Sequence, residues 1–207
     1  FCMNARTAMA ILLQHKDGRS CFPLDQEVII WRLLTQILEK QEGVDPNIIG
    51  QNYSMFDVFM LHAHGLCWRK LLDNIYIDTM EGFQVYQPQL PKGLDFITSI
   101  YTREPYYKSE GKIWDHYLGE NEFLTYGCKD VLTVHEAAPQ IENDLREAGL
   151  WNFYEERCKR NAYHRMSMTI NGITRDEKKR EELEKKFTID IMENQAALNL
   201  SVGWNVN

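Results

Sequence analysis

The sequence predicts a β-sheet covered by helices, in the α/β or α+β class, on the basis of three observations. Segments with strand character gather before residue 78 of the 207-residue chain. A helical pattern lies between two of them, which gives one strand–helix–strand alternation. Helical periodicity then dominates from about residue 121 to the end of the sequence.

A turn signal near the N-terminus predicts a hairpin. Lys16-Asp17-Gly18 stands between two segments of strand character, residues 6–13 and 19–24. Beyond it, apolar spacing predicts helices over residues 25–40, 54–64, 94–101 and 121–138 and strands over residues 47–50 and 75–77. Asp25 is suited to cap the first helix, and Gly65 to end the second in a left-handed conformation.

Pro139 marks the expected domain boundary. It separates a sheet-bearing domain, residues 1–139, from a helical part, residues 140–207. Two long helices are expected in the second part, over residues 141–161 and 175–200.

Composition indicates a globular, intracellular protein. The chain is 44% hydrophobic and 26% charged, which argues against disorder. Its apolar runs fall short of the roughly 20 residues that cross a bilayer, and no secretory signal pattern opens the sequence, so we expect a soluble cytoplasmic protein without a membrane partner. The five cysteines are scattered without a C-x-x-C pair, which favours reduced thiols.

Charge is distributed unevenly along the chain. The net charge is −7; residues 1–150 hold 13 basic and 21 acidic side chains, a net of −8, whereas residues 151–186 hold 10 and 7, a net of +3. An acidic protein is an unusual partner for nucleic acid, and a solvated acidic surface is the simple interpretation. Divalent cations held on carboxylates would nevertheless supply positive charge where phosphate binds.

Two short constellations carry candidate chemistry. Asn52 is expected at the end of a strand and Asp57 in the first turn of the next helix, at a sheet edge where clefts form. Tyr126 and Asp130 are four residues apart on a predicted helix and share one face. Carboxylates are ligands for Mg²⁺ or Mn²⁺, and a tyrosine can orient an attacking water, so the set suits two-metal phosphodiester hydrolysis. Taken alone, Asp57 is more simply explained as a helix cap, and Tyr126 with Asp130 as a partly buried tyrosine hydrogen-bonded to a surface carboxylate.

The order of these motifs resembles the 3'→5' proofreading exonuclease domain of family A (polymerase I-like) DNA polymerases, phage members in particular. The shared landmarks are N-x-x-x-F-D from Asn52 to Asp57, Ile77-Asp78-Thr79-Met80, Leu90-Pro91-Lys92-Gly93-Leu94-Asp95-Phe96, and Y-x-x-x-D from Tyr126 to Asp130. Downstream, the segments Tyr154-Glu155-Glu156-Arg157, Met168 to Asp176 and Gly203 to Asn207 resemble the passage into the polymerase thumb.

The resemblance implies an α/β, ribonuclease H-like fold of the DEDD exonuclease superfamily, with a mixed sheet and a helical C-terminal extension. Asp57 and Asp130 would bind a two-ion Mg²⁺ or Mn²⁺ site, and Tyr126 would orient the water. Asn52, Tyr53 and Phe56 would bind substrate.

By the same resemblance the partners would be DNA, as a single-stranded 3' end or a primer-template, and the rest of a polymerase chain. The location would be the cytoplasm, or the host cytoplasm for a phage protein.

One departure concerns the family's first motif, a D-x-E on the opening strand. The only D-x-E in the chain is Asp25-Gln26-Glu27, at the start of a predicted helix, where it reads as a cap and a first-turn acid. We expect the family's motif just upstream of Phe1. Without it the chain should bind Mg²⁺ poorly, and a noncatalytic, DNA-binding scaffold is the alternative function.

Two basic regions have open interpretations. The loop over residues 101–112 mixes Arg103, Lys108 and Lys112 with tyrosines, which suits either a single-strand contact or a packed loop. The run Lys178-Lys179-Arg180 alternates with glutamates, which favours a solvated helix face. The thumb resemblance implies instead that it binds the phosphates of duplex DNA. His62 and His64 form no metal-ligand pattern on their predicted helix.

Overall fold

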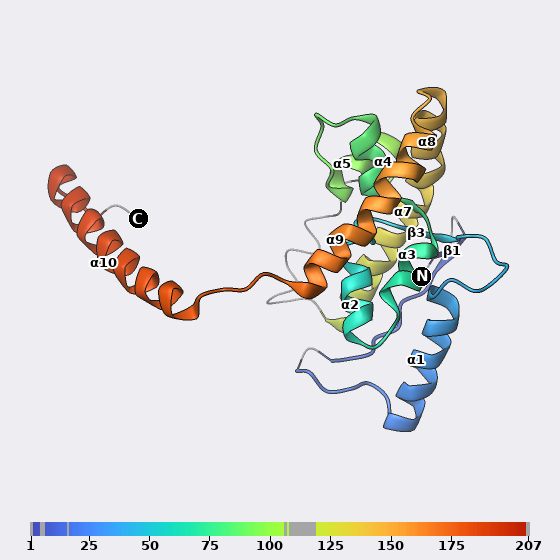
Figure 1. Cartoon of the computed structure of the whole chain (residues 1–207), viewed down its shortest axis with the longest axis horizontal. Helices are drawn as coiled ribbons and strands as arrows, with labels where there is room; N and C mark the ends of the chain where they lie inside the picture. The colour runs from blue at the N-terminus through green and yellow to red at the C-terminus, as the bar shows by residue number, and fades with distance from the viewer. Residues whose placement is uncertain (1, 5–6, 16, 106, 108–118, 206–207) are drawn as a thin grey trace. The chain divides into compact units, whose positions relative to one another are not determined.

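The structure is a computed structural model that describes residues 2–4, 7–15, 17–105, 107 and 119–205. It has two compact units, Phe1–Ile170 and Asn171–Asn207, whose elements can be followed in Figure 1. Six residues of the predicted basic loop lie outside the described residues, namely residues 106 and 108–112, which include Tyr106, Lys108 and Lys112.

A strand–helix–strand module forms the centre of the first unit. β3 (Ile48–Gly50) and β4 (Ile75–Asp78) pair in parallel. Parallel strands cannot be joined by a tight turn, and α2 (Asp57–Ala63) and α3 (Trp68–Asp73) make the crossover. The α/β class and both strands are therefore confirmed.

The N-terminal hairpin differs from the expectation. β1 (Cys2–Asn4) pairs antiparallel with β2 (Thr7–Ala8), upstream of the predicted turn. At that turn a single bridge joins Gln14 to Ser20. The strand predicted over residues 19–24 is wrong, because the described chain bends after this bridge and enters a helix at Leu24.

α1 (Leu24–Leu38) confirms the first predicted helix, with one correction at its start. Pro23 occupies the cap position, where its ring sets φ at −57°, and no side chain caps the helix. Asp25 is therefore a first-turn acid that favours the helix dipole rather than a cap. At the end of α2, Gly65 has φ +95°, as the left-handed ending requires.

Two helices that follow β4 pack against a long third one. α4 (Thr79–Tyr86) begins directly after the strand, with Asp78 as its cap. α5 (Leu94–Tyr101) has the predicted bounds. Both contact α7 (Glu120–Glu147), which also contacts β3 and β4.

The helix α7 continues through Pro139, so it does not end at residue 138 as predicted. Proline removes one backbone hydrogen bond from a helix interior, but Ala137, Ala138 and Ile141 around it are fully buried. Packing against α4 and α5 thus outweighs the local signal. The compact units divide at Ile170, and the domain boundary expected at Pro139 stays a prediction.

Three short segments complete the first unit. α8 (Trp151–Phe153) leads into η1 (Tyr154–Cys158), a π-helical segment, and then into α9 (Lys159–Asn171). Buried side chains of these segments join both apolar clusters of the unit. The first cluster holds Leu34, Leu38, Tyr53, Val58, Leu66, Leu71, Leu72, Ile75, Ala162 and Met166, and the second Ile77, Phe83, Ile97, Tyr101, Ala137, Ala138, Ile141, Leu145, Trp151 and Tyr154.

The second unit consists mainly of α10 (Glu177–Val202). The side chain of Asp176 caps it by accepting a hydrogen bond from the Lys179 backbone N–H, and Gly203 ends it at φ +79°. This confirms the last predicted helix. In the described part of the chain, no helix combines the length and apolarity that crossing a membrane requires.

Candidate functional site

The Asp78 carboxylate organises the loop that leads to Asp57. β3 and β4 are in register so that Gly50 lies opposite Asp78, which brings the start of the loop beside this side chain. Oδ1 of Asp78 accepts a hydrogen bond of 2.9 Å from the Asn52 backbone N–H, and Oδ2 one of 3.1 Å from that of Ser54. The same carboxylate accepts from the backbone N–H groups of Met80 and Glu81. One buried side chain therefore holds both the loop and the start of α4.

Burial and charge act together on Asp78. The residue is 1% exposed, and burial together with the nearby Glu81 charge raises the pKa of its carboxyl to about 6, against the lowering effect of the hydrogen bonds from Ser54 and Asn52. The Tyr154 hydroxyl accepts a hydrogen bond of 2.8 Å from the Asp78 backbone N–H. The end of β4 is thus fixed from the loop, from α4 and from η1.

Backbone geometry in the loop explains an asparagine at position 52. Asn52 has φ +56°, a left-handed conformation that asparagine tolerates better than most residues. Its backbone N–H is the group that binds Asp78. Asn52 therefore shapes the loop, a role that the sequence did not indicate.

Asp57 is the first residue of α2, as the sequence predicts. Burial raises the pKa of its carboxyl to about 6, so the protein holds this group in an environment that disfavours its charge. A divalent cation would reverse that preference, because it favours the ionised carboxylate. A half-buried acid with a raised pKa is a candidate for a functional group.

Tyr53 and Phe56 flank Asp57 in opposite environments. Tyr53 is 8% exposed and packs in the first apolar cluster; its pKa is raised by burial first and by the charge of Asp57 second. Phe56 is 62% exposed. An aromatic ring open to solvent beside Asp57 is a surface on which a nucleobase could stack, whereas the Tyr53 ring belongs to the core.

Tyr107 joins the second predicted pair on α7. Tyr126 and Asp130 are both half-buried there. The Tyr107 hydroxyl donates a hydrogen bond of 2.7 Å to Oδ1 of Asp130 and lies 3.0 Å from Oγ1 of Thr133, while its ring centroid is 5.8 Å from that of Tyr126. Burial is the largest cause that raises the pKa of Tyr107, so it stays a neutral donor.

The predicted residues thus fall into two groups. The loop before α2 brings Asn52, Tyr53, Phe56 and Asp57 together, and α7 carries Tyr126 and Asp130. The two groups are linked through β3, which precedes the loop and contacts α7. Direct convergence of Asp57 and Asp130 stays a prediction. Within the described residues, no group of three or more His, Cys, Asp and Glu side chains is arranged to hold a metal ion.

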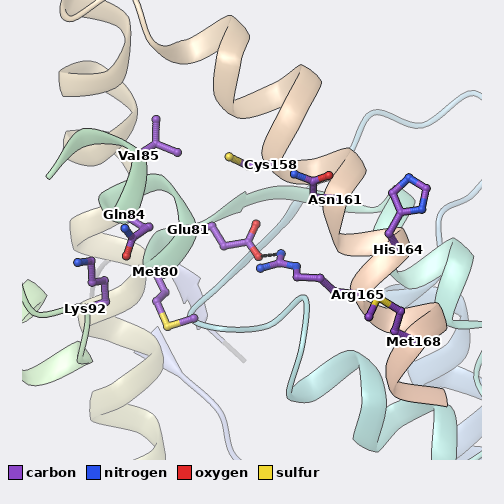
Figure 2. A pocket seen from close by; sticks show the side chains of 10 residues that line it. All are labelled: Met80, Glu81, Gln84, Val85, Lys92, Cys158, Asn161, His164, Arg165 and Met168. Carbon is purple, nitrogen blue, oxygen red and sulfur yellow. Dashed lines mark hydrogen bonds and ion pairs between the residues drawn. The ribbon is translucent and has the colours of Figure 1, made fainter. Parts of the chain in front are cut away.

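A second network joins the loop to α9. The Ser54 hydroxyl donates a hydrogen bond of 2.7 Å to Oε1 of Glu81, and the Arg165 guanidinium forms an ion pair with the same oxygen. Figure 2 shows these two charged side chains reaching toward each other from α4 and α9. Because Glu81 is 8% exposed, its charge needs this partner.

Three residues of these networks were not predicted as site residues: Asp78, Glu81 and Tyr107. Asp78 could have been found, since an aspartate between a strand and Thr79-Met80-Glu81 has the pattern of a helix cap. The partners of Glu81 and Tyr107 lie 84 and 23 residues away, and no local spacing reveals such pairs.

Comparison with models of known protein families, with curated proteins and with solved structures found no match.

Proposed function

We propose that this chain carries the 3'→5' exonuclease module of a family A DNA polymerase and the start of its thumb, with a ribonuclease H-like fold. The module would hydrolyse the 3'-terminal phosphodiester of single-stranded DNA and release nucleoside monophosphates. The order of the four motifs between Asn52 and Asp130 supports this proposal. The α/β module built by β3, α2, α3 and β4 agrees with it.

The observation that carries the proposal is the fixed loop in front of Asp57. Two backbone N–H groups of the loop and two of α4 bind the Asp78 carboxylate, so the turn that presents Asp57 is tied to the start of α4. Asp57 itself has a raised pKa of about 6. A carboxylate that is costly to ionise and rigidly presented is prepared for a cation rather than for solvent.

The chain's own residues fit the oxygen chemistry of Mg²⁺ or Mn²⁺, although they supply only part of a full ligand set. Asp57 and Asp130 would hold the two ions, which when bound would stabilise the charge that develops on the phosphate. Tyr126 would hold the attacking water by a hydrogen bond. The water oxygen forms a bond to phosphorus, the bond from phosphorus to the 3' oxygen breaks, and that oxygen leaves with a proton.

A noncatalytic scaffold is the second candidate, and the position of the single D-x-E favours it. Asp25 and Glu27 lie in the first turn of α1, where Glu27 accepts a hydrogen bond of 2.8 Å from the Ser20 hydroxyl. These two acids are therefore explained by helix geometry. In this alternative the same fold supports DNA binding by a polymerase without cleaving it.

Degradation of 5'-labelled single-stranded DNA by the chain and by its parent polymerase, with Mg²⁺ or Mn²⁺, separates the two functions. We expect Asp130→Ala and Asp57→Ala to abolish cleavage, with polymerisation by the parent unchanged. Asp144→Ala is the matched control, because Asp144 lies on the same helix and binds Tyr101.

Undiminished cleavage by Asp130→Ala would show that the assignment of this residue is wrong. A parent protein that cleaves with neither metal would favour the scaffold.

A further inference from the structure

Two hollows lie along η1 and α9, and the first reaches Glu81, which also binds Ser54 of the loop before Asp57. The first is a cleft of about 490 Å³ between α4 and α9, and the second is a depression of about 320 Å³ on η1 and the start of α9. Asn161 and His164 line both hollows, which together are called the groove below. Figure 2 shows side chains of α4 on one side of the first cleft and those of α9 on the other.

The first hollow has an apolar floor with polar edges. Met80 and Val85 of α4 face Met168 of α9 across it. The amides of Gln84 and Asn161 stand among these apolar groups and can both donate and accept hydrogen bonds. A flat ring with polar edges, such as a nucleobase, matches this mixture.

The second hollow is cationic. Arg157, Arg160 and His164 follow each other at spacings of three and four residues, which places them on one face of the helical segment. Both arginines are exposed, and neither forms an ion pair with a described residue. Glu156 is the acidic residue in this lining. On α10, by contrast, Arg180 is neutralised by Glu177 and Glu184.

Arg165 does not contribute free charge to the groove. Its guanidinium is committed to the buried Glu81, so it holds the wall of the cleft in place. Lys92 lies at the opposite edge, where its ammonium donates a hydrogen bond to the Pro88 carbonyl and keeps its charge. The uncompensated cations are therefore Arg157, Arg160 and Lys92, against Glu156.

We infer that this groove binds a nucleotide unit of a single-stranded nucleic acid. The phosphate lies against Arg157 and Arg160, where guanidinium groups can bind it in a bidentate manner. The base lies on the apolar floor of the first cleft. In an extended strand each base lies beside a phosphate, which matches an apolar hollow next to a cationic one. The inference goes beyond the exonuclease proposal, because it uses none of the residues assigned to catalysis.

Fluorescence anisotropy with a 5'-labelled twelve-residue oligothymidylate tests the groove in the full chain. EDTA is present, so binding is measured without hydrolysis. We expect Arg157→Gln with Arg160→Gln to weaken binding about tenfold and to reduce the slope of log affinity against log salt by about 1.4, since single strands lose about 0.7 per phosphate contact. Arg32→Gln with Lys40→Gln removes the same charge elsewhere in the first unit and should change neither.

Three further ligands test the chemistry. An abasic oligomer of equal length should bind more weakly than oligothymidylate, because it lacks the ring. Free thymidine monophosphate carries the same phosphate and base as the oligomer. If it displaces the oligomer, the result supports a nucleotide site. If it binds as tightly as the oligomer, the free nucleotide is the occupant of the groove. Oligoglutamate should not compete.

Equal loss in both double variants, or equal binding of the abasic oligomer, would overturn the inference. Oligoglutamate that binds as well as the oligonucleotide would instead make the groove a site for acidic protein. If Asp130→Ala abolishes cleavage while oligonucleotide binding is unchanged, the result bears on the proposed function and not on the groove. If the protein cleaves DNA and the Arg157→Gln, Arg160→Gln variant binds the oligonucleotide as well as the wild type does, the groove inference is refuted and the proposed function stands.

Discussion

The backbone N–H of Asn52 donates a hydrogen bond of 2.9 Å to the carboxylate of Asp78, 26 residues further along the chain. With the bond from Ser54 it closes the loop between β3 and α2 onto the end of β4. Asn52 occupies a left-handed region that asparagine tolerates, and the bond to Asp78 helps to hold the backbone there. The presentation of Asp57 therefore depends on a residue outside its own loop.

Asp78→Asn should lower the free energy of unfolding by about 2–4 kcal/mol, because the amide keeps one acceptor and turns an NH₂ group toward a buried backbone donor. Urea denaturation at pH 8 measures the change. Asp45→Asn is the control: Asp45 is exposed, and its substitution should stay within about 0.5 kcal/mol. Equal effects of the two substitutions would contradict the role given to Asp78.

Asp57→Asn should stabilise the protein at pH 8 and have little effect near pH 3.5. The carboxyl has a pKa of about 6 in the folded chain, against the ordinary aspartate value of 3.8, so the folded state binds more protons between these values. Stability conferred by the wild-type residue thus falls as pH rises through this window. We expect the variant to gain about 1–2 kcal/mol above pH 7 in urea denaturation. A difference that does not vary with pH would argue against a buried acid.

Tyr107→Phe should raise the Mn²⁺ concentration needed for half-maximal cleavage by about three- to tenfold, because Asp130 loses the donor that fixes one of its oxygens. The rate at saturating metal should change less than twofold. Tyr101→Phe removes an equivalent 2.6 Å hydrogen bond to Asp144 on the same helix. Each variant should lose about 1 kcal/mol of stability. Only the first should change the metal requirement, and a shift in both would indicate a general loosening of α7.

Two glycine-to-alanine substitutions should change the stability of the protein in opposite directions. A Cβ on Gly50 would lie 2.4 Å from Cβ of Tyr53, so Gly50→Ala must displace the loop, at a cost of about 3 kcal/mol. A Cβ on Gly127, inside α7, would meet nothing within 4 Å. Gly127→Ala should raise stability by about 0.5–1 kcal/mol through helix propensity. Thermal melts compare the two, and a neutral Gly50→Ala would mean that the loop has room to move.

Local patterns predicted the elements whose causes are local. α5 has its predicted bounds, and Gly65 ends α2 as its type suggests, because an amphipathic repeat and a left-handed glycine are encoded within a few residues. The helix end expected at residue 138 was a local inference too, and α7 continues past it because Ala137, Ala138 and Ile141 are buried in the second apolar cluster. α4 was not predicted, since its cap at Asp78 was interpreted only as part of a motif.

In the candidate site too, local spacing predicted some features and missed others. The position of Asp57 at the start of α2 and the common helix of Tyr126 and Asp130 follow from spacing, and the structure has both. The ties from Tyr107 to Asp130 and from Arg165 to Glu81 depend on which elements meet in space, which no spacing within one element contains.

The buried side chain of Tyr154 limits where the chain can be shortened without unfolding the first unit. A shortened chain that stops at Pro139 would lose Tyr154 and Met166, both fully buried, together with the acceptor for the Asp78 backbone N–H. Such a fragment would expose the insides of both apolar clusters and should aggregate. Separate expression of the first unit therefore calls for a cut after Ile170, near the end of α9.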